Sequence, residues 1–158
     1  MKDFATYHLA QIIFYYKKMW LKCVQFNDRA TRSEFWYAYL AHAAIGIIVY
    51  FCLSGSIALF VMISRLYALA SFIPFLALTA RRLHDVGKPI SHCFAPAAAT
   101  TLSIIFMIMG IASRVFIVLG GICLILSLVT WAYLIYLLAQ QGVYGDNQYG
   151  ADPRQMYS

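Results

Sequence analysis

Four long apolar stretches dominate this sequence, and they constrain its fold more than any other feature. A helix needs about 20 apolar residues to cross the hydrocarbon core of a bilayer, which is roughly 30 Å thick. The stretches have that length, and within them only Arg65 carries a formal charge. We therefore predict membrane-spanning helices over residues 35–53, 57–80, 93–112 and 115–139.

The composition agrees with a chain that lives in a membrane. Hydrophobic residues make up 63% of it and charged residues only 11%, whereas about a quarter of an ordinary soluble domain is charged. Turn formers at Ser54, Gly55 and Ser56 separate the first two spans, and only Ser113 and Arg114 separate the last two. So short a turn predicts an antiparallel hairpin for the third and fourth spans.

The positive charges predict how the spans are oriented. Of the twelve Lys and Arg residues, all but Arg65 and Arg114 flank the same side of the predicted spans. Positive charge near span ends is retained in the cytoplasm. We therefore expect both termini to be cytoplasmic.

The segment before the first span has a helical pattern of its own. Read as a helix, it places His8, Gln11, Tyr15, Lys18 and Lys22 on one side and apolar residues on the other. This pattern is typical of an interfacial helix that binds anionic lipid. A helix that packs against the bundle or binds a partner fits it equally well.

Together these features predict an all-α membrane protein, a four-transmembrane-helix bundle preceded by an amphipathic interfacial helix. We assign the interfacial helix to residues 1–28, the membrane domain to residues 29–141, and an ordered cytoplasmic loop to residues 142–158. Proline at position 74 predicts a kink in the second span.

Three polar segments adjoin the spans and hold the candidate functional residues. In the first, Thr31 and Glu34 have the spacing of a capping box at the start of a helix. In the second, His84 and Asp85 are open to three interpretations: a proton-handling pair, a phosphate-facing site, or a structural ion pair with Arg29 or Arg32.

The third polar segment, residues 142–154, is too rich in turn formers to be a helix. We expect it to fold back, so that Asp146 and Asp152 meet Arg81, Arg82 or Arg29. The predicted cytoplasmic cluster consists of Arg29, Arg32, Glu34, Arg81, Arg82, His84, Asp85, Asn147, Tyr149 and Asp152.

The same three segments carry a resemblance to a known family. An Arg-Ala-x-Arg-x-Glu-Phe-Trp stretch begins at Arg29, an Arg-Arg-Leu-His-Asp stretch at Arg81, and a Gly-x-x-Gly-x-Asn-x-Tyr-Gly-x-Asp-Pro stretch at Gly142. In this order they resemble the DUF805 family of small bacterial inner-membrane proteins, whose function is unknown. The resemblance covers about residues 20–154 and implies location and topology, but no reaction.

The chain departs from the family pattern at two places. Asp28 stands where the family usually has glycine, and Ser91, His92 and Cys93 stand where it commonly has tryptophans. The second departure removes an interface anchor and puts any role of those tryptophans in doubt for this chain.

Cofactor chemistry has little support in the sequence. The four cysteines are scattered, and His92 beside Cys93 lacks a second pair of ligands. Phosphate-binding loops and nucleophile motifs are also missing from the sequence. We expect neither cofactor nor metal, and no nucleic-acid partner.

Three functions remain open. The first is a non-enzymatic scaffold or regulator that acts on a membrane-protein partner, or a second copy, through its polar cytoplasmic face. The second is a small transporter or lipid-handling protein, in which the arginines contact an anionic lipid headgroup. The third is an enzyme acting on a lipid phosphate, with His84 as general base, and it ranks last because a His-Asp neighbour pair is a common dipeptide.

Overall fold

The computed structural model describes residues 2–53, 57–111 and 113–155, so the predicted turn at residues 54–56 lies outside the described residues. Within them the chain forms five α-helices and one 3-10 turn: α1 (Lys2–Leu21), α2 (Arg32–Leu53), α3 (Ile57–Asp85), η1 (Ile90–Cys93), α4 (Phe94–Met109) and α5 (Arg114–Ala139). Helices α2, α3 and α5, and α4 together with η1, are long and apolar enough to cross a membrane. The predicted fold class, four spans after an N-terminal helix, is confirmed.

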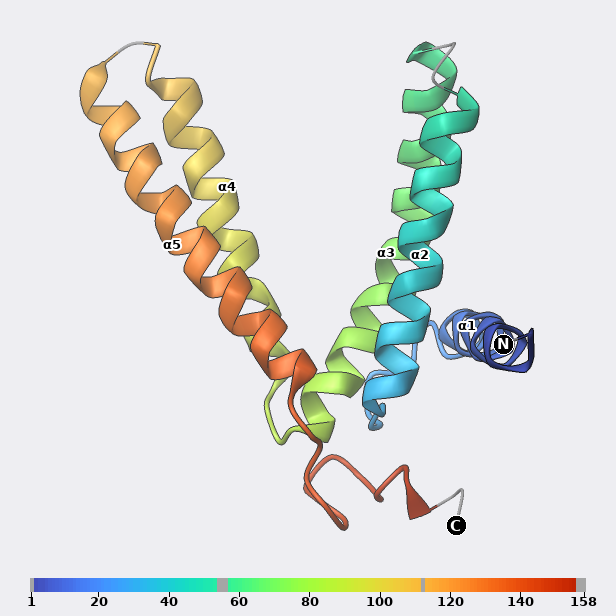
Figure 1. Cartoon of the computed structure of the whole chain (residues 1–158). Helices are drawn as coiled ribbons and strands as arrows, with labels where there is room; N and C mark the ends of the chain where they lie inside the picture. The colour runs from blue at the N-terminus through green and yellow to red at the C-terminus, as the bar shows by residue number, and fades with distance from the viewer. Residues whose placement is uncertain (1, 54–56, 112, 156–158) are drawn as a thin grey trace.

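The helices form two hairpins that meet at one end and diverge toward the other (Figure 1). Helices α2 and α3 make one hairpin and α4 and α5 the other, and the two touch where α5 contacts α3 and α2. Helix α1 lies across the base of the first hairpin, and the C-terminal segment folds beneath both. We call this converging region the polar end: helix α1, residues 22–31, the start of α2, the ends of α3 and α5, and residues 140–155.

The second span is longer than predicted. We expected it to end at residue 80, but α3 continues to Asp85. The arginines of its last turns are buried and paired, so they do not force the helix to end. It ends at Gly87, whose φ of 72° lets the amides of Gly87 and Lys88 bond to the carbonyls of His84 and Leu83 at 3.0 and 2.9 Å.

Helix α1 turns its polar stripe toward the bundle. The ring of His8 lies 2.6 Å from the Tyr37 hydroxyl, and Lys18 and Lys22 form ion pairs with Glu34 and Asp28. Its exposed side chains are largely apolar, among them Phe4, Leu9 and Ile13. The polar stripe of α1 therefore packs against the bundle, as the bundle-packing interpretation predicted. The apolar face of α1 is exposed.

The α4–α5 hairpin is joined through small polar residues. The Ser103 hydroxyl donates to the Gly120 carbonyl at 3.0 Å, and the hydroxyls of Thr100 and Ser127 lie 2.7 Å apart. Small residues let the two backbones approach closely enough for such bonds, which is how spanning helices commonly associate. Ser113 caps α5 by accepting the amide of Val115 at 3.4 Å.

Candidate functional site

All ten residues of the predicted cluster lie at the polar end, but most of them are buried rather than displayed on a face. Arg81 and Arg82 are 0% exposed, Glu34 1%, and Arg29 and Asp85 2% each. Charges survive in such surroundings only when they are paired and hydrogen-bonded. The contacts below show how nearly each one is satisfied.

Asp85 is bound on both of its oxygens. Arg29 donates from Nε and Nη2 to Oδ1 at 3.1 and 2.9 Å, and Arg82 donates from Nη1 to Oδ2 at 2.5 Å. One carboxylate therefore joins the segment before α2 to the end of α3. Of the two arginines proposed from sequence as partners of Asp85, Arg29 is correct and Arg32 is not.

Glu34 is likewise shared by two cations. Its Oε1 accepts from Arg81 Nη1 at 3.1 Å and its Oε2 from Lys18 Nζ at 2.5 Å. Half of the predicted capping box is present, because Thr31 Oγ1 accepts the Glu34 amide at 3.2 Å. The other half is wrong, since the Glu34 carboxylate bonds to these cations instead of returning to the start of the helix.

The C-terminal segment completes the site with backbone carbonyls. Arg29 donates to the carbonyls of Val143 and Gly145 at 2.5 and 2.6 Å, and the Val143 amide donates to the Asp85 carbonyl at 2.8 Å. Arg82 donates to the carbonyls of Leu138 and Gln140 at the end of α5. This segment therefore supplies acceptors that the two arginines would otherwise lack.

The aspartates of that segment do not pair with the arginines predicted for them. Asp152 instead bonds to Arg154 Nε at 2.7 Å and accepts the Gly145 amide at 2.9 Å, and Asp146 accepts the Asp152 amide at 3.1 Å. The hydrogen bond from the Arg154 side chain holds the pKa of Asp152 well below its ordinary value. These contacts order the loop itself.

His84 packs against the same loop. Its ring stacks on Tyr149 with centroids 4.0 Å apart, and Asn147 Nδ2 donates to its carbonyl at 2.9 Å. The residue is 7% exposed, and its Nδ1 has no hydrogen-bond partner among the described residues. Tyr149 therefore covers one face of the imidazole ring.

Arg32 differs from the rest of the cluster, because it is exposed and takes no part in the buried network. It lines a pocket of about 380 Å³ at the polar end, together with Lys18, Ser33 and Arg154. Sequence reasoning did not include Lys18, Ser33 or Arg154 in the cluster. The seven-residue spacing of the α1 stripe was the signal that could have placed Lys18 there.

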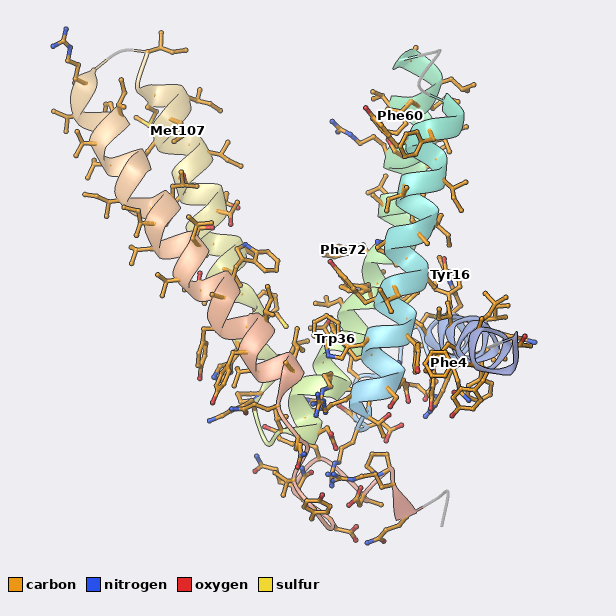
Figure 2. The ribbon with its side chains drawn as sticks, in the orientation of Figure 1. Phe4, Tyr16, Trp36, Phe60, Phe72 and Met107 are labelled. Atoms are coloured by element: carbon orange, nitrogen blue, oxygen red, sulfur yellow. The ribbon has the colours of Figure 1, made fainter. Side chains whose placement is uncertain are left out.

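An apolar groove of about 570 Å³ lies between the two hairpins. Figure 2 shows Trp36 and Phe72 directed from the α2–α3 hairpin toward the other hairpin, and both line the groove. Trp131 and Leu134 of α5 line it from the opposite side. Sequence reasoning missed this groove, which exists only because the hairpins diverge.

No group of three or more His, Cys, Asp or Glu side chains in the described ranges is arranged to hold a metal ion. The ion-pair network contributes two carboxylates, and both are already bound by cations.

Comparison with known proteins gives a family and two named relatives. Residues 23–151 match the family described as "Protein of unknown function (DUF805)". The chain is 29% identical over 136 residues to the inner membrane protein YhaI of Escherichia coli strain K12, covering 83% of this chain and 87% of that protein. The YhaI protein of Escherichia coli O157:H7 gives the same values. No solved structure matches.

Proposed function

Because this multi-pass inner-membrane chain belongs to the DUF805 family of proteins of unknown function, we propose a function from its own geometry. It is a non-enzymatic membrane scaffold whose two hairpins, joined at the polar end, hold the hydrocarbon chain of a membrane lipid between them. The apolar groove is the observation that carries this proposal.

The size of the groove suits a lipid chain. Its volume of about 570 Å³ lies within the range of roughly 300–1,000 Å³ that is usual for small-molecule sites. A partner's spanning helix, about 30 Å long and 10 Å across, occupies roughly 2,400 Å³. A helix would therefore lie mostly outside the groove, whereas a single flexible chain fits within it.

The lining of the groove is suited to hydrocarbon. Phe35, Tyr39 and Phe75 add aromatic rings from α2 and α3, and Ile135 and Leu138 add aliphatic side chains from α5. The groove lies between membrane spans, so the molecules around it are lipids. A chain held there gains contacts on several sides at once, whereas a chain on the outer surface of one helix gains them on one side.

The buried charges support a scaffold role. Arg29, Arg81, Arg82 and Asp85 are engaged with the protein itself, so binding an outside partner with them would first require breaking internal ion pairs. A partner at the polar end would instead meet residues that stay exposed, such as Tyr144, which is 77% exposed. The charged residues of the sequence motifs therefore serve to connect the two hairpins at the polar end.

An enzyme acting on a lipid phosphate is less well supported. Its general base would be His84, which is 7% exposed and covered by Tyr149. Its orienting carboxylate, Asp85, already accepts from two arginines. A general base must lie within hydrogen-bond distance of the proton that it removes.

Native mass spectrometry of the full chain extracted with its own lipids tests the proposal. We expect about one lipid per chain to survive washing with excess detergent. Ala68→Trp and Ala97→Trp place a large ring in the groove wall and are expected to reduce the retained lipid about tenfold, equivalent to roughly 1.4 kcal/mol.

Matched controls exist on the same helices. Ala70 and Ala98 are exposed but do not line the groove, so Ala70→Trp and Ala98→Trp should retain the lipid. Equal retention in all four variants, or no retained lipid in the unaltered chain, would contradict the proposal.

A further inference from the structure

We propose that the pocket at the polar end, lined by Lys18, Arg32, Ser33 and Arg154, is a binding site for a phosphate group. The site is separate from the apolar groove. The two have no lining residue in common, although both extend to the start of α2. The inference goes beyond the proposed function and stands or falls without it.

Three cations from different parts of the chain line this pocket. Lys18 comes from α1, Arg32 from the first turn of α2, and Arg154 from the C-terminal segment. The open pocket that they help to line has a volume of about 380 Å³, which leaves room for a phosphate and part of the molecule that carries it. Arginine and lysine are the side chains that bind phosphate best, through charge-assisted hydrogen bonds.

The carboxylates in the pocket wall do not cancel this charge. Glu34 and Asp85 are present, but each is already bound by two cations. Across these ion pairs, the Asp152 pair and the pocket wall, six cations meet three carboxylates, an excess of three positive charges. The cations are Lys18, Arg29, Arg32, Arg81, Arg82 and Arg154, and the carboxylates are Glu34, Asp85 and Asp152.

Two of these cations have donor atoms that meet no acceptor in the described part of the chain. The Arg32 side chain has no ion-pair or hydrogen-bond partner within the described part of the chain, and Arg32 and Arg154 both repel the buried Arg82 electrostatically. Arg81, which bonds to the pocket residue Glu34, is 0% exposed, and its Nη2 has no acceptor in the described ranges. An anion in the pocket would relieve the excess charge.

The start of α2 adds neutral donors to the same wall. Thr31 occupies the amide of Glu34, and its carbonyl accepts the amide of Phe35. The amides of Arg32 and Ser33 meet no acceptor in the described ranges, and both residues line the pocket. A helix start directs its amides and its positive dipole end toward an anion.

The position of the pocket admits two sources of phosphate. It lies where a spanning helix begins, and Tyr15 of α1 forms part of its wall. Lipid headgroups occupy that level of a bilayer, and soluble phosphate compounds also have access to it. The phosphate group is the chemistry that the two sources share.

Two binding measurements on the full chain in lipid nanodiscs test the site and separate the sources. In the lipid arm, nanodiscs of phosphatidylcholine with a minor share of phosphatidic acid are analysed by native mass spectrometry for retained phosphatidic acid. In the soluble arm, nanodiscs of phosphatidylcholine alone are titrated with inorganic phosphate at constant ionic strength, and the thermal unfolding midpoint is recorded.

The variant is Arg32→Gln, which breaks no internal contact, and the matched control is Lys17→Gln, an exposed cation on α1 outside the pocket. We expect Arg32→Gln to weaken binding about tenfold, as for loss of a hydrogen bond to a charged group, and Lys17→Gln to leave it unchanged. Ser33→Ala should weaken it by a smaller factor.

Binding in the lipid arm alone supports a headgroup as occupant, and binding in the soluble arm alone supports a free phosphate compound. Binding in both arms that is weakened by Arg32→Gln supports a site open to either. No binding in either arm, or equal loss in Arg32→Gln and Lys17→Gln, overturns the proposal. Ala68→Trp, which fills the groove, should not change these results, so a failure here is distinguishable from a failure of the groove.

Discussion

The two ends of this bundle are held together in different ways. At the polar end, Arg81 and Arg82 are completely buried, and carboxylates and backbone carbonyls surround them. Away from it the hairpins separate, and large apolar side chains such as Ile48, Leu69 and Ile108 are 59%, 75% and 64% exposed. Buried ion pairs hold the polar end together, whereas the other end exposes apolar side chains.

The difference reflects the solvent of each region. Inside a bilayer, apolar contact between helices stabilises little, because lipid tails are as apolar as leucine. A buried charge left without its partner is strongly unfavourable, so removing one member of a buried ion pair destabilises the fold. The contacts that fix the arrangement of the helices are therefore concentrated at the charged polar end. They set how the two hairpins are placed relative to each other.

Removing a carboxylate from the polar end should have the largest effect. Asp85→Asn leaves Arg29 and Arg82 without their anion in a buried site, and we expect a loss of about 3–5 kcal/mol in the free energy of unfolding. Denaturant titration in detergent micelles, followed by circular dichroism, measures it.

Asp146→Asn is the control, because Asp146 is exposed and asparagine keeps an oxygen that can accept the Asp152 amide. It should change the free energy by less than about 0.5 kcal/mol. Similar losses in both variants would show that the effect of Asp85→Asn does not come from burial of its ion pairs.

A methyl group added at the polar end should be the next most harmful change. A Cβ on Gly142 would overlap the Asp85 carboxylate, whereas a Cβ on Gly46, in the middle of α2, would meet nothing. We expect Gly142→Ala to destabilise the fold by about 1–3 kcal/mol and Gly46→Ala to be neutral or mildly stabilising. The same titration checks both, and a reversed order would break the comparison.

The stack between His84 and Tyr149 should contribute a smaller amount. Tyr149→Ala removes a ring whose centroid lies 4.0 Å from that of His84, with an expected cost of about 0.5–1.5 kcal/mol. Tyr149→Phe keeps the ring and should behave as the unaltered chain. Hydrogen exchange over residues 142–155 measures whether this segment becomes less ordered. Equal exchange in both variants would show that the stack does not stabilise the segment.

The smallest effect is expected within the α4–α5 hairpin. Ser103→Ala deletes the bond to the Gly120 carbonyl, and such bonds between spanning helices are worth about 0.6 kcal/mol on average. Thr101→Ala is a control outside the interface, since Thr101 is exposed and bonds within its own helix. A loss comparable to that of Asp85→Asn would show that the far end is held as firmly as the polar end.

Sequence alone located the spans well, because hydrocarbon requires long uninterrupted apolar runs. It set the limit of the second span at residue 80, whereas α3 continues to Asp85, because the burial of Arg81 and Arg82 depends on Glu34 of α2 and on carbonyls at the end of α5. The ten cluster residues were found together, as their segments all adjoin one side of the predicted spans.

Other parts of the site could not be predicted from the types of side chain in the sequence. Arg29 bonds to the carbonyls of Val143 and Gly145, and any residue type offers a carbonyl, so these partners depend on loop conformation. The groove depends on the angle between the hairpins, which periodicity within each helix does not encode. The roles of the groove and of the phosphate pocket are accordingly proposals from geometry.

The contacts of Arg29 also have a consequence for the order of synthesis. Its carboxylate partner lies 56 residues later in the chain, and its carbonyl partners lie 114 and 116 residues later. All four spans must therefore be made and inserted before this guanidinium can be fully satisfied. A chain whose synthesis stops after α5 would lack the carbonyls of Val143 and Gly145, and Arg29 would be left without these two acceptors.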